Sequence, residues 1–524
     1  MWNPPIALSP AEQQSAARTQ KARQCFVFLR TRRHELLDAA FQQTLAERSR
    51  PAPGGNVPVE AGVLALATLL QASGNVGARE AVERTVRDTR WPLVLACLGA
   101  EPPPFRQGTL FHFRLRLIPH NLDKPLLERT VAVAEQTGGC GARQLRAALD
   151  SPPLCGAGRV EDPLHRLGHA LRQAGGLAAQ GLGTSTEAIV EDAGLVLGGH
   201  SSLQAALDLD GGEPTARDSA LRRVLDEVER WKRWLEPPPS LSAQEPPLKA
   251  MMDTMGQMVA QDTAPAPEAG AGERRRKHHV APDRRISIED ADMRHGRQRS
   301  AKTFNGFTEP VALDLDSKVT REGVVCPANH PEHAAVERLA EELEQGPGLL
   351  QLDIDLGDMA SARIAQWAAQ GVDIMARPWP QGGPLCTTPD CTLDFQHGTV
   401  TCPHGQTGLM VPGKDAQFPA RACDACPVRA QGPTARLGHG RRLTIREDEP
   451  FQHTLRAKRK TKRGRTALRK RTAVEHAISQ HLAHQGRRAR YKGLRKHQFD
   501  GRRHAAVSNL QVAARSAEER QLAS

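Results

Sequence analysis

Two aspartates and one glutamate stand where a chain could place carboxylates for metal-dependent phosphoryl chemistry. Asp150 and Asp353 each follow a short apolar run, and the end of a strand is where a rigid scaffold presents ligands. Glu475 lies in an expected helix from about Thr466 to Gln485. Two Mg²⁺ ions held by such oxygens activate an attacking oxygen and stabilise the leaving one in an in-line displacement. These residue types therefore suit a two-metal site.

The spacing alone does not select these three acids from the 59 in the chain. Glu475 could instead pair with Arg471, one helical turn earlier, in a surface contact worth about 0.3 kcal/mol. Five further aspartates compete for the same role: Asp290, Asp292, Asp314, Asp316 and Asp355. On pattern alone, the choice stays open.

The segments around these acids alternate between strand and helix. Strands are expected at 308–315, 323–326, 349–352 and 372–376, and helices at 330–344 and 361–370. Residues 145–149 suit a strand, although their composition would suit a helix equally well. We therefore predict an α/β or α+β catalytic core in two parts, 141–235 with Asp150 and 301–380 with Asp353.

Composition divides the rest of the chain into five parts. Residues 1–140 are expected to form a helical N-terminal domain, because apolar residues recur at helical spacing. We expect this domain to bind DNA, as a helix-turn-helix would, and the alternative is a packed bundle without that role. Residues 236–300 are poor in apolar periodicity and rich in Pro, Ala and Gly in places, which predicts a linker or loosely ordered connection. The remaining expectations are an irregular cysteine-rich insert at 381–450, a basic region with the Glu475 helix at 451–510 and a disordered tail at 511–524.

Positive charge is concentrated around Glu475. Between Arg456 and Arg503 there are 18 Lys or Arg residues and two acids, so this stretch carries +16 while the whole chain carries +12. Such a patch attracts a phosphate backbone without reading its sequence. Residues that we expect to contact DNA are Arg471, Arg487, Arg488, Arg490, Lys492, Arg495 and Lys496.

Several classes of function are disfavoured by the composition. Aromatic residues make up 4% of the chain and Tyr491 is the single tyrosine, so base stacking on single strands is a poor fit and duplex DNA a better one. No Arg-His-Arg set accompanies Tyr491 as a tyrosine recombinase would need, and no P-loop Lys-Ser/Thr is present. No run reaches the ~20 apolar residues of a membrane span, and the N-terminus lacks signal-peptide features. We expect a cytoplasmic protein associated with the bacterial nucleoid.

Five of the ten cysteines fall within the insert. A Cys-x₂-Cys pair together with a second close pair is typical of a tetrahedral Zn²⁺ site. The four thiols in question are Cys386, Cys391, Cys423 and Cys426. Zinc would fold a segment that otherwise lacks a core; the alternative is a set of reduced thiols in a loop.

Beyond these patterns, the chain resembles bacterial insertion-sequence transposases of the DDE class from about Pro58 to Asn509. The resemblance lies in the segments 150–162 (DSPPLCGAGRVED), 283–290 (DRRISIED), 293–297 (MRHGR), 327–332 (PANHPE), 471–476 (RTAVEH), 485–493 (QGRRARYKG) and 509–510 (NL). It implies a ribonuclease-H-like mixed sheet flanked by helices, two bound Mg²⁺ ions, and strand cleavage and transfer on double-stranded DNA at element ends and target. It also implies a homo-oligomer on DNA.

Carried over to this chain, the resemblance makes Asp150, Asp353 and Glu475 the catalytic, metal-binding triad. Arg471 fits the family's Arg-x-x-x-Glu signature. Around the second acid the family shows Asp-x-x-Tyr-Gly, whereas this chain has Leu356 in place of Tyr, and a small shift in register would select Asp355 instead. Further departures at Pro152 and Thr308 motivate an alternative function, a DNA-binding relict without catalysis.

Overall fold

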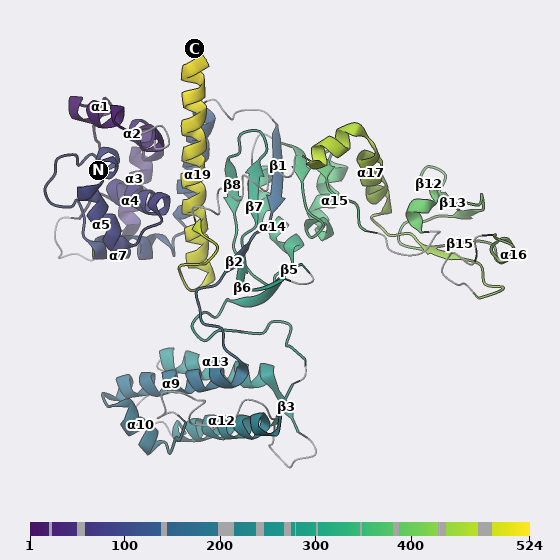
Figure 1. The fold of residues 1–524 in the computed structure, drawn as a ribbon, viewed down its shortest axis with the longest axis horizontal. Coiled ribbons are helices and arrows are strands. Elements are labelled where there is room, and N and C mark those ends of the chain that lie inside the picture. The colour runs from purple at the N-terminus through teal and green to yellow at the C-terminus, as the bar shows by residue number, and fades with distance from the viewer. Residues whose placement is uncertain are drawn as a thin grey trace.

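The computed structural model describes residues 1–19, 24–49, 58–137, 144–197, 214–236, 246–266, 274–277, 279–299, 302–345, 348–380, 387–427, 429, 436–469 and 485–523. A mixed sheet stands at the centre, with N-terminal helices on one side, a small set of short strands on the other, and a separate helical bundle below (Figure 1). Glu475, Arg471 and Cys386 lie outside the described residues.

The central sheet has the strand order β11-β10-β1-β7-β8. Its strands are β1 (Leu145–Asp150), β7 (Val311–Asp314), β8 (Thr320–Gly323), β10 (Leu349–Asp353) and β11 (Asp373–Met375). β1, β10 and β11 run parallel, whereas β1–β7 and β7–β8 pair antiparallel. Leu145, Ala147 and Leu149 face a core shared with α14 (Glu332–Glu344) and α15 (Ala362–Ala369). A short 3₁₀ helix, η2 (Asp358–Ala360), precedes α15.

Most of the expected core elements are confirmed, with one difference in the strands after residue 300. The strand expected at 308–315 is divided into β6 (Lys302–Thr308) and β7, and that expected at 323–326 into β8 and β9 (Cys326–Pro327). Pro310 lies in the first break, where proline has no backbone N–H to give to a ladder. The sheet formed by β2 (Pro153–Cys155), β6, β5 (Arg294–Arg299) and β9 extends away from the central one.

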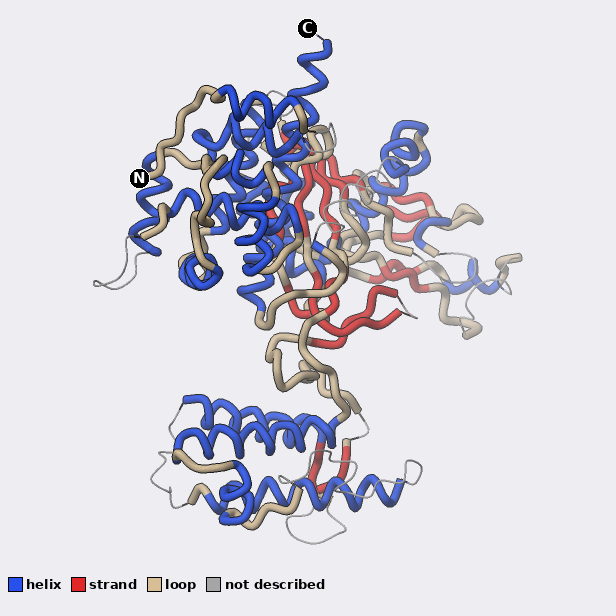
Figure 2. The backbone as a smooth tube through the Cα atoms, turned by 60° about the vertical axis from the view of Figure 1, so that its left-hand side comes forward, coloured by secondary structure: helices blue, strands red, loops and turns tan. Residues whose placement is uncertain are grey.

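A helical bundle is inserted between β2 and β5. It consists of α9 (Pro163–Leu182), α10 (Thr186–Asp192), α12 (Pro214–Trp234), α13 (Pro246–Asp262), β3 (Thr263–Pro265) and β4 (Arg274–Arg276). Leu171, Val224 and Met255 belong to its own apolar core, and loops alone connect it to the body (Figure 2). Where we expected a linker at 236–300, the structure places α13 packed on α9. The apolar face of α13 is built largely from methionines, and this hid the helical periodicity.

The N-terminal helices pack around the C-terminal helix α19 (Leu494–Ala523). They are α1 (Pro10–Ala17), α2 (Gln24–Leu36), α3 (Ala39–Ser49), α4 (Ala61–Gly74), α5 (Ala78–Arg87), α6 (Arg90–Leu95), α7 (Gln107–Leu117) and α8 (Asp123–Gln136). Phe499, Val507 and Leu510 of α19 belong to the same apolar core as the helices. The expected disordered tail at 511–524 is instead helical to Ala523, because Ala513 packs against α8.

In the described part of the chain, no one helix has both the length and the apolar character to cross a membrane. Only α4 and α5 taken together would satisfy those criteria, and they meet at an angle of 98°.

The cysteine-rich insert folds around a small apolar core that includes Val400, Phe418 and Ile445. Its elements are η3 (Thr388–Asp390), β12 (Thr392–Asp394), β13 (Thr399–Thr401), β14 (Thr407–Leu409), β15 (Asp415–Gln417), α16 (Ala420–Asp424) and β16 (Arg442–Thr444). We expected an irregular segment without a core, and the structure shows short strands that bury one. Helix α17 (Glu449–Lys460) then returns to the central sheet, where Leu455 joins the sheet's apolar core.

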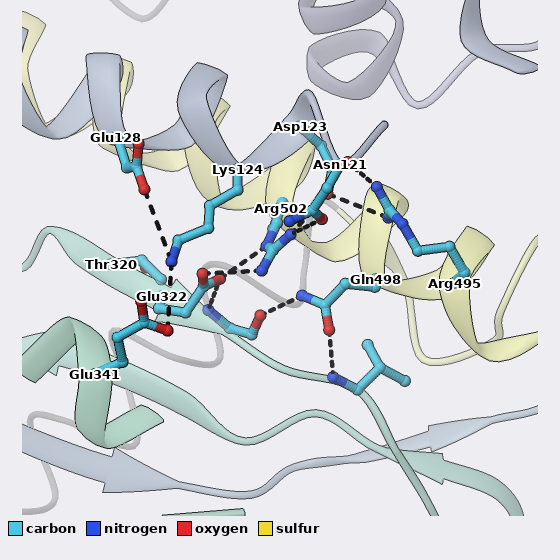
Figure 3. A network of polar contacts seen from close by, with 12 residues as sticks. Asn121, Asp123, Lys124, Glu128, Thr320, Glu322, Glu341, Arg495, Gln498 and Arg502 are labelled. Atoms are coloured by element: carbon cyan, nitrogen blue, oxygen red, sulfur yellow. Dashed lines mark hydrogen bonds and ion pairs between the residues drawn. The ribbon is translucent and has the colours of Figure 1, made fainter. Parts of the chain in front are cut away.

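A buried polar network joins α8, α19 and β8 (Figure 3). Arg502 donates to both carboxylate oxygens of Glu322, at 2.9 and 3.0 Å, and to Asp123 at 3.1 Å. Gln498 donates to the carbonyl of Gly323 and accepts from Val325 N at 2.8 Å. The network fixes the C-terminal helix to an edge strand of the central sheet.

Glu342 lies near this network, and the pH dependence of its contribution to stability tests the electrostatics of the network. Burial and the negative charges of Glu322 and Glu128 raise the pKa of Glu342 above its usual 4.5. A carboxyl group whose pKa is raised in the folded state contributes stability that is fully present below pH 4.5, its usual pKa. This contribution is lost as the pH rises through the folded-state pKa. Glu342→Gln should therefore raise the free energy of unfolding at pH 7, by less than about 1 kcal/mol, and have no effect at pH 4.

The comparison is made by native-state hydrogen exchange of the α14 amides at the two pH values. Glu341→Gln is the matched control, since the Glu341 side chain is largely exposed and lies 4.0 Å from Lys124. A gain for Glu342→Gln of the same size at pH 4 and pH 7 would contradict the electrostatic origin.

Candidate active site

Two of the three predicted acids lie on neighbouring parallel strands. Asp353 pairs with Ala148 in the β1–β10 register, so Asp150 lies two residues further along β1. From ideal strand geometry their Cα atoms are roughly 8 Å apart. Both side chains are on the face of the sheet opposite α14, because Leu149 and Leu352 face the helices and side chains alternate along a strand. The fold thus brings together two carboxylates that are 203 positions apart in the sequence.

The two carboxylates differ in their surroundings. Asp353 is 4% exposed, and its Oδ1 accepts a hydrogen bond from Gln351 Nε2 at 2.7 Å. Asp150 is half-buried, and its Oδ1 accepts from the backbone N–H of Ser151 at 2.9 Å. Gln351 is itself held by Arg146 Nε at 3.1 Å. Side-chain and backbone donors therefore orient both acids, as a preorganised ligand set requires.

Asp353 opens into a cavity of about 1010 Å³ that is rich in positive charge. The basic residues lining it are Arg146, Lys318, Lys458, Lys462 and Arg463. Arg146 pairs with Asp316 at 2.9 Å, and Lys458 pairs with Asp373, whereas Lys462 and Arg463 form no ion pair with the described residues. Asp150 is not among the described residues that line this cavity. A carboxylate beside exposed cations suits a phosphodiester substrate.

The rival aspartates have other surroundings. Asp314 accepts from the backbone N–H groups of Asp316 and Ser317, closing the turn after β7. Asp292 accepts from Leu494 N at 2.8 Å and so caps the start of α19. Asp290 is buried beside His497 of α19. Asp355 follows Asp353 in the loop after β10, and its backbone N–H donates to Asp358 at 3.3 Å.

The segment that precedes Glu475 in the sequence lines the same cavity. Thr461, Gly464, Thr466 and Ala467 line it together with the cations, and residues 462–469 are helical. Glu475 and Arg471 themselves lie outside the described residues, so their place in the site stays a prediction. The chain is described again from Gln485, a buried residue.

Several residues predicted to contact DNA make contacts within the protein. Lys492 pairs with Glu289 at 2.9 Å, Arg495 pairs with Asp123, and Arg490 donates to the carbonyl of Asn75. Arg487, Arg488 and Lys496 are exposed. The sequence pattern did not single out Lys462 and Arg463, although both belong to the basic run before Glu475.

Comparison with known protein families gives a match in the C-terminal part of the chain. Residues 401–514 match the family model described as Transposase DDE domain. The chain carries a transposase DDE domain near its C-terminus. Searches of curated proteins and of solved structures give no match. A transposase DDE domain implies a ribonuclease-H-like fold and polynucleotidyl transferase chemistry, and the mixed central sheet agrees with that fold.

DDE transposases generally use a divalent metal, and the two described acids suit one. Carboxylate oxygens are the ligands that Mg²⁺ prefers, and Asp150 and Asp353 lie on one face of the sheet. Within the described ranges, no three His, Cys, Asp or Glu residues group as a metal site; the expected third ligand, Glu475, is outside them. Two of the three predicted metal ligands are therefore among the described residues.

The predicted zinc ligands do not group within the described residues either. Cys423 and Cys426 are free thiols among the described residues, and Cys391 and Cys423 pack against the apolar core of the insert, as does Cys402. Cys386, the fourth predicted ligand, lies outside the described residues. Zinc in the insert stays a prediction.

Proposed function

We propose that the protein is a DNA transposase that cleaves and transfers the strands of an insertion sequence with the help of two Mg²⁺ ions. The observation that carries this proposal is the convergence of Asp150 and Asp353 on one face of a ribonuclease-H-like sheet, with Asp353 beside a cation-lined cavity. The transposase DDE domain at 401–514 gives independent support. The substrate is double-stranded DNA at the element ends and at the target, bound by a homo-oligomer.

In this proposal Asp150, Asp353 and Glu475 hold the metal ions. When bound, the ions activate the attacking oxygen and stabilise the leaving one. The protein orients Asp353 through Gln351 and keeps it away from bulk water by burial. Lys462 and Arg463 hold the phosphates on either side of the scissile bond, because both are exposed and line the same cavity as Asp353.

The alternative function is DNA binding without catalysis, in a relict of such an enzyme. It is favoured by Leu356, which packs against the apolar core of the sheet where the resembling family has a tyrosine. A hydroxyl that could contact DNA is therefore missing beside the second acid. This alternative expects DNA affinity that falls steeply with salt, and no product.

Incubation of the full-length protein with Mg²⁺ and duplexes containing the ends of its element decides between the two. A transposase is expected to produce nicks that leave 3′-OH groups, and chelation of the metal with EDTA should abolish them. Product is resolved on denaturing gels, and DNA binding is measured on the same samples by fluorescence anisotropy. Tight binding without nicks, from protein with an intact circular-dichroism spectrum, would favour the relict.

A further inference from the structure

Helix α17 and the helical residues 462–469 separate two cavities. The one beside Asp353 is lined by Lys458, Lys462 and Arg463. A second one, of about 1280 Å³, is lined from the same segment by a different set of side chains: His453, Arg456, Ala457, Arg459, Lys460, Arg465, Leu468 and Arg469. No described residue lines both cavities. The segment therefore presents positive charge on two sides.

The second cavity is more uniformly basic than the first. Its basic side chains are Arg377, Arg456, Arg459, Lys460, Arg465 and Arg469, and no acid is among the described residues that line it. Arg456 is paired with the buried Glu449. The other five form no ion pair with the described residues, and all five are exposed. Since unpaired exposed cations gain most from a polyanion, this surface is suited to a phosphate backbone.

Residues 378–380 also line the second cavity and are fixed in place. Trp379 Nε1 donates to Asp448 Oδ2 at 3.0 Å, and its backbone N–H donates to Gln452 Oε1 at 2.9 Å. Gln452 is buried, and Pro378 and Pro380 stiffen the chain on either side of Trp379. The cations thus line a preformed groove with a rigid wall.

We propose that the second cavity binds the backbone of a DNA duplex segment other than the strand acted on at Asp353. The inference rests on the proposed function, which supplies DNA as the partner. On α17, His453, Arg456, Ala457 and Lys460 follow the i, i+3, i+4, i+7 spacing of one helix face. Arg456 and Lys460 are the cations of this face, and Arg459, Arg465 and Arg469 continue the positive charge along the segment to residue 469. Cations distributed over this length match successive phosphates of a strand better than one small anion. DNA on this side would also contact the segment that leads to Glu475.

The test compares three variants of the full-length protein with the wild type, without added metal, so that no cleavage occurs. The groove variant R377Q/K460Q/R469Q removes three charges that have no ion-pair partner among the described residues, and R377K/K460R/R469K retains them as the matched control. K462Q/R463Q removes two charges from the cavity beside Asp353. The probe is a fluorescent 12-bp duplex of unrelated sequence, roughly 40 Å long, which is too short and stiff to wrap around the helix into both cavities.

Wild type is expected to bind two such duplexes per chain, and the groove variant and K462Q/R463Q one each. The slope of log K against log salt should become shallower by roughly two to three units in the groove variant, about 0.9 for each lost phosphate contact. R377K/K460R/R469K should resemble wild type. An unchanged slope and stoichiometry in R377Q/K460Q/R469Q would overturn the proposal, as would stronger competition by a 12-bp RNA duplex than by DNA. Because binding is measured without metal, absence of nicking would count against the transposase and not against this groove.

Discussion

Asp353→Asn is expected to slow Mg²⁺-dependent nicking by about 10³-fold while changing DNA affinity less than twofold. Asn has the shape of Asp and can keep the contact with Gln351, so the fold should be unaffected. It lacks the negative charge that holds a divalent ion, which contributes several kcal/mol to stabilisation of the transition state, and about 4 kcal/mol corresponds to 10³-fold. Single-turnover nicking and anisotropy measure the two effects separately. The same result is expected for Asp150→Asn.

Asp316→Asn is the matched control for this prediction. Asp316 lines the same cavity but is 61% exposed and pairs with Arg146, so its loss should change the nicking rate by less than about threefold. Asp355→Asn resolves the choice of the second acid. If Asp355→Asn abolishes nicking and Asp353→Asn does not, the second metal ligand is Asp355, in the loop after β10, and our assignment of Asp353 is wrong.

Arg502→Met is expected to destabilise the junction of α19 with β8 by about 3–5 kcal/mol. The Arg502 side chain is 9% exposed, and its removal leaves Glu322, with 5% of its side chain exposed, without its guanidinium partner. Loss of one member of a buried ion pair costs about this much because the other charge stays buried. A chain with several domains does not unfold in two states, so the measurement is native-state hydrogen exchange of the α19 and β8 amides.

Arg495→Met serves as the comparison for Arg502. Arg495 also pairs with Asp123, but its side chain is 34% exposed, and a loss of about 1 kcal/mol or less is expected. Equal losses of stability for the two substitutions would contradict the prediction that Arg502 contributes more because it lies between the carboxylates of Asp123 and Glu322.

Much of the catalytic core could be predicted from the sequence because its strands are short apolar runs that end in acids. Leu145–Asp150 and Leu349–Asp353 are of this kind, and both are strands in the structure. Their parallel pairing could not be read from the residues, since nothing in either run specifies its neighbour. The helical bundle was not predicted: α9, α10 and α12 fall within the range 141–235 that we assigned to the catalytic core. Helix α13 was missed because its apolar face relies on flexible methionines such as Met255 and Met258.

The basic region shows why charge alone does not locate a site. Residues 487–496 and 456–469 are equally rich in Lys and Arg, yet their surroundings differ. Lys492 and Arg495 pair with carboxylates of distant segments, whereas Lys462 and Arg463 line the cavity of Asp353. A cation is available to bind DNA only where no carboxylate from a distant part of the chain pairs with it, and the sequence does not reveal such partners.

The packing of α19 among the N-terminal helices has a consequence for synthesis of the protein. Phe499, Val507 and Leu510 complete an apolar core whose other members begin at Phe26. Domains usually fold in the order in which the ribosome releases them, but this one lacks part of its interior until the last helix has emerged. A chain that stops before residue 494 therefore exposes apolar surface and is a target for proteolysis. A truncated copy of the gene would then yield no stable N-terminal domain to compete with the intact protein for DNA.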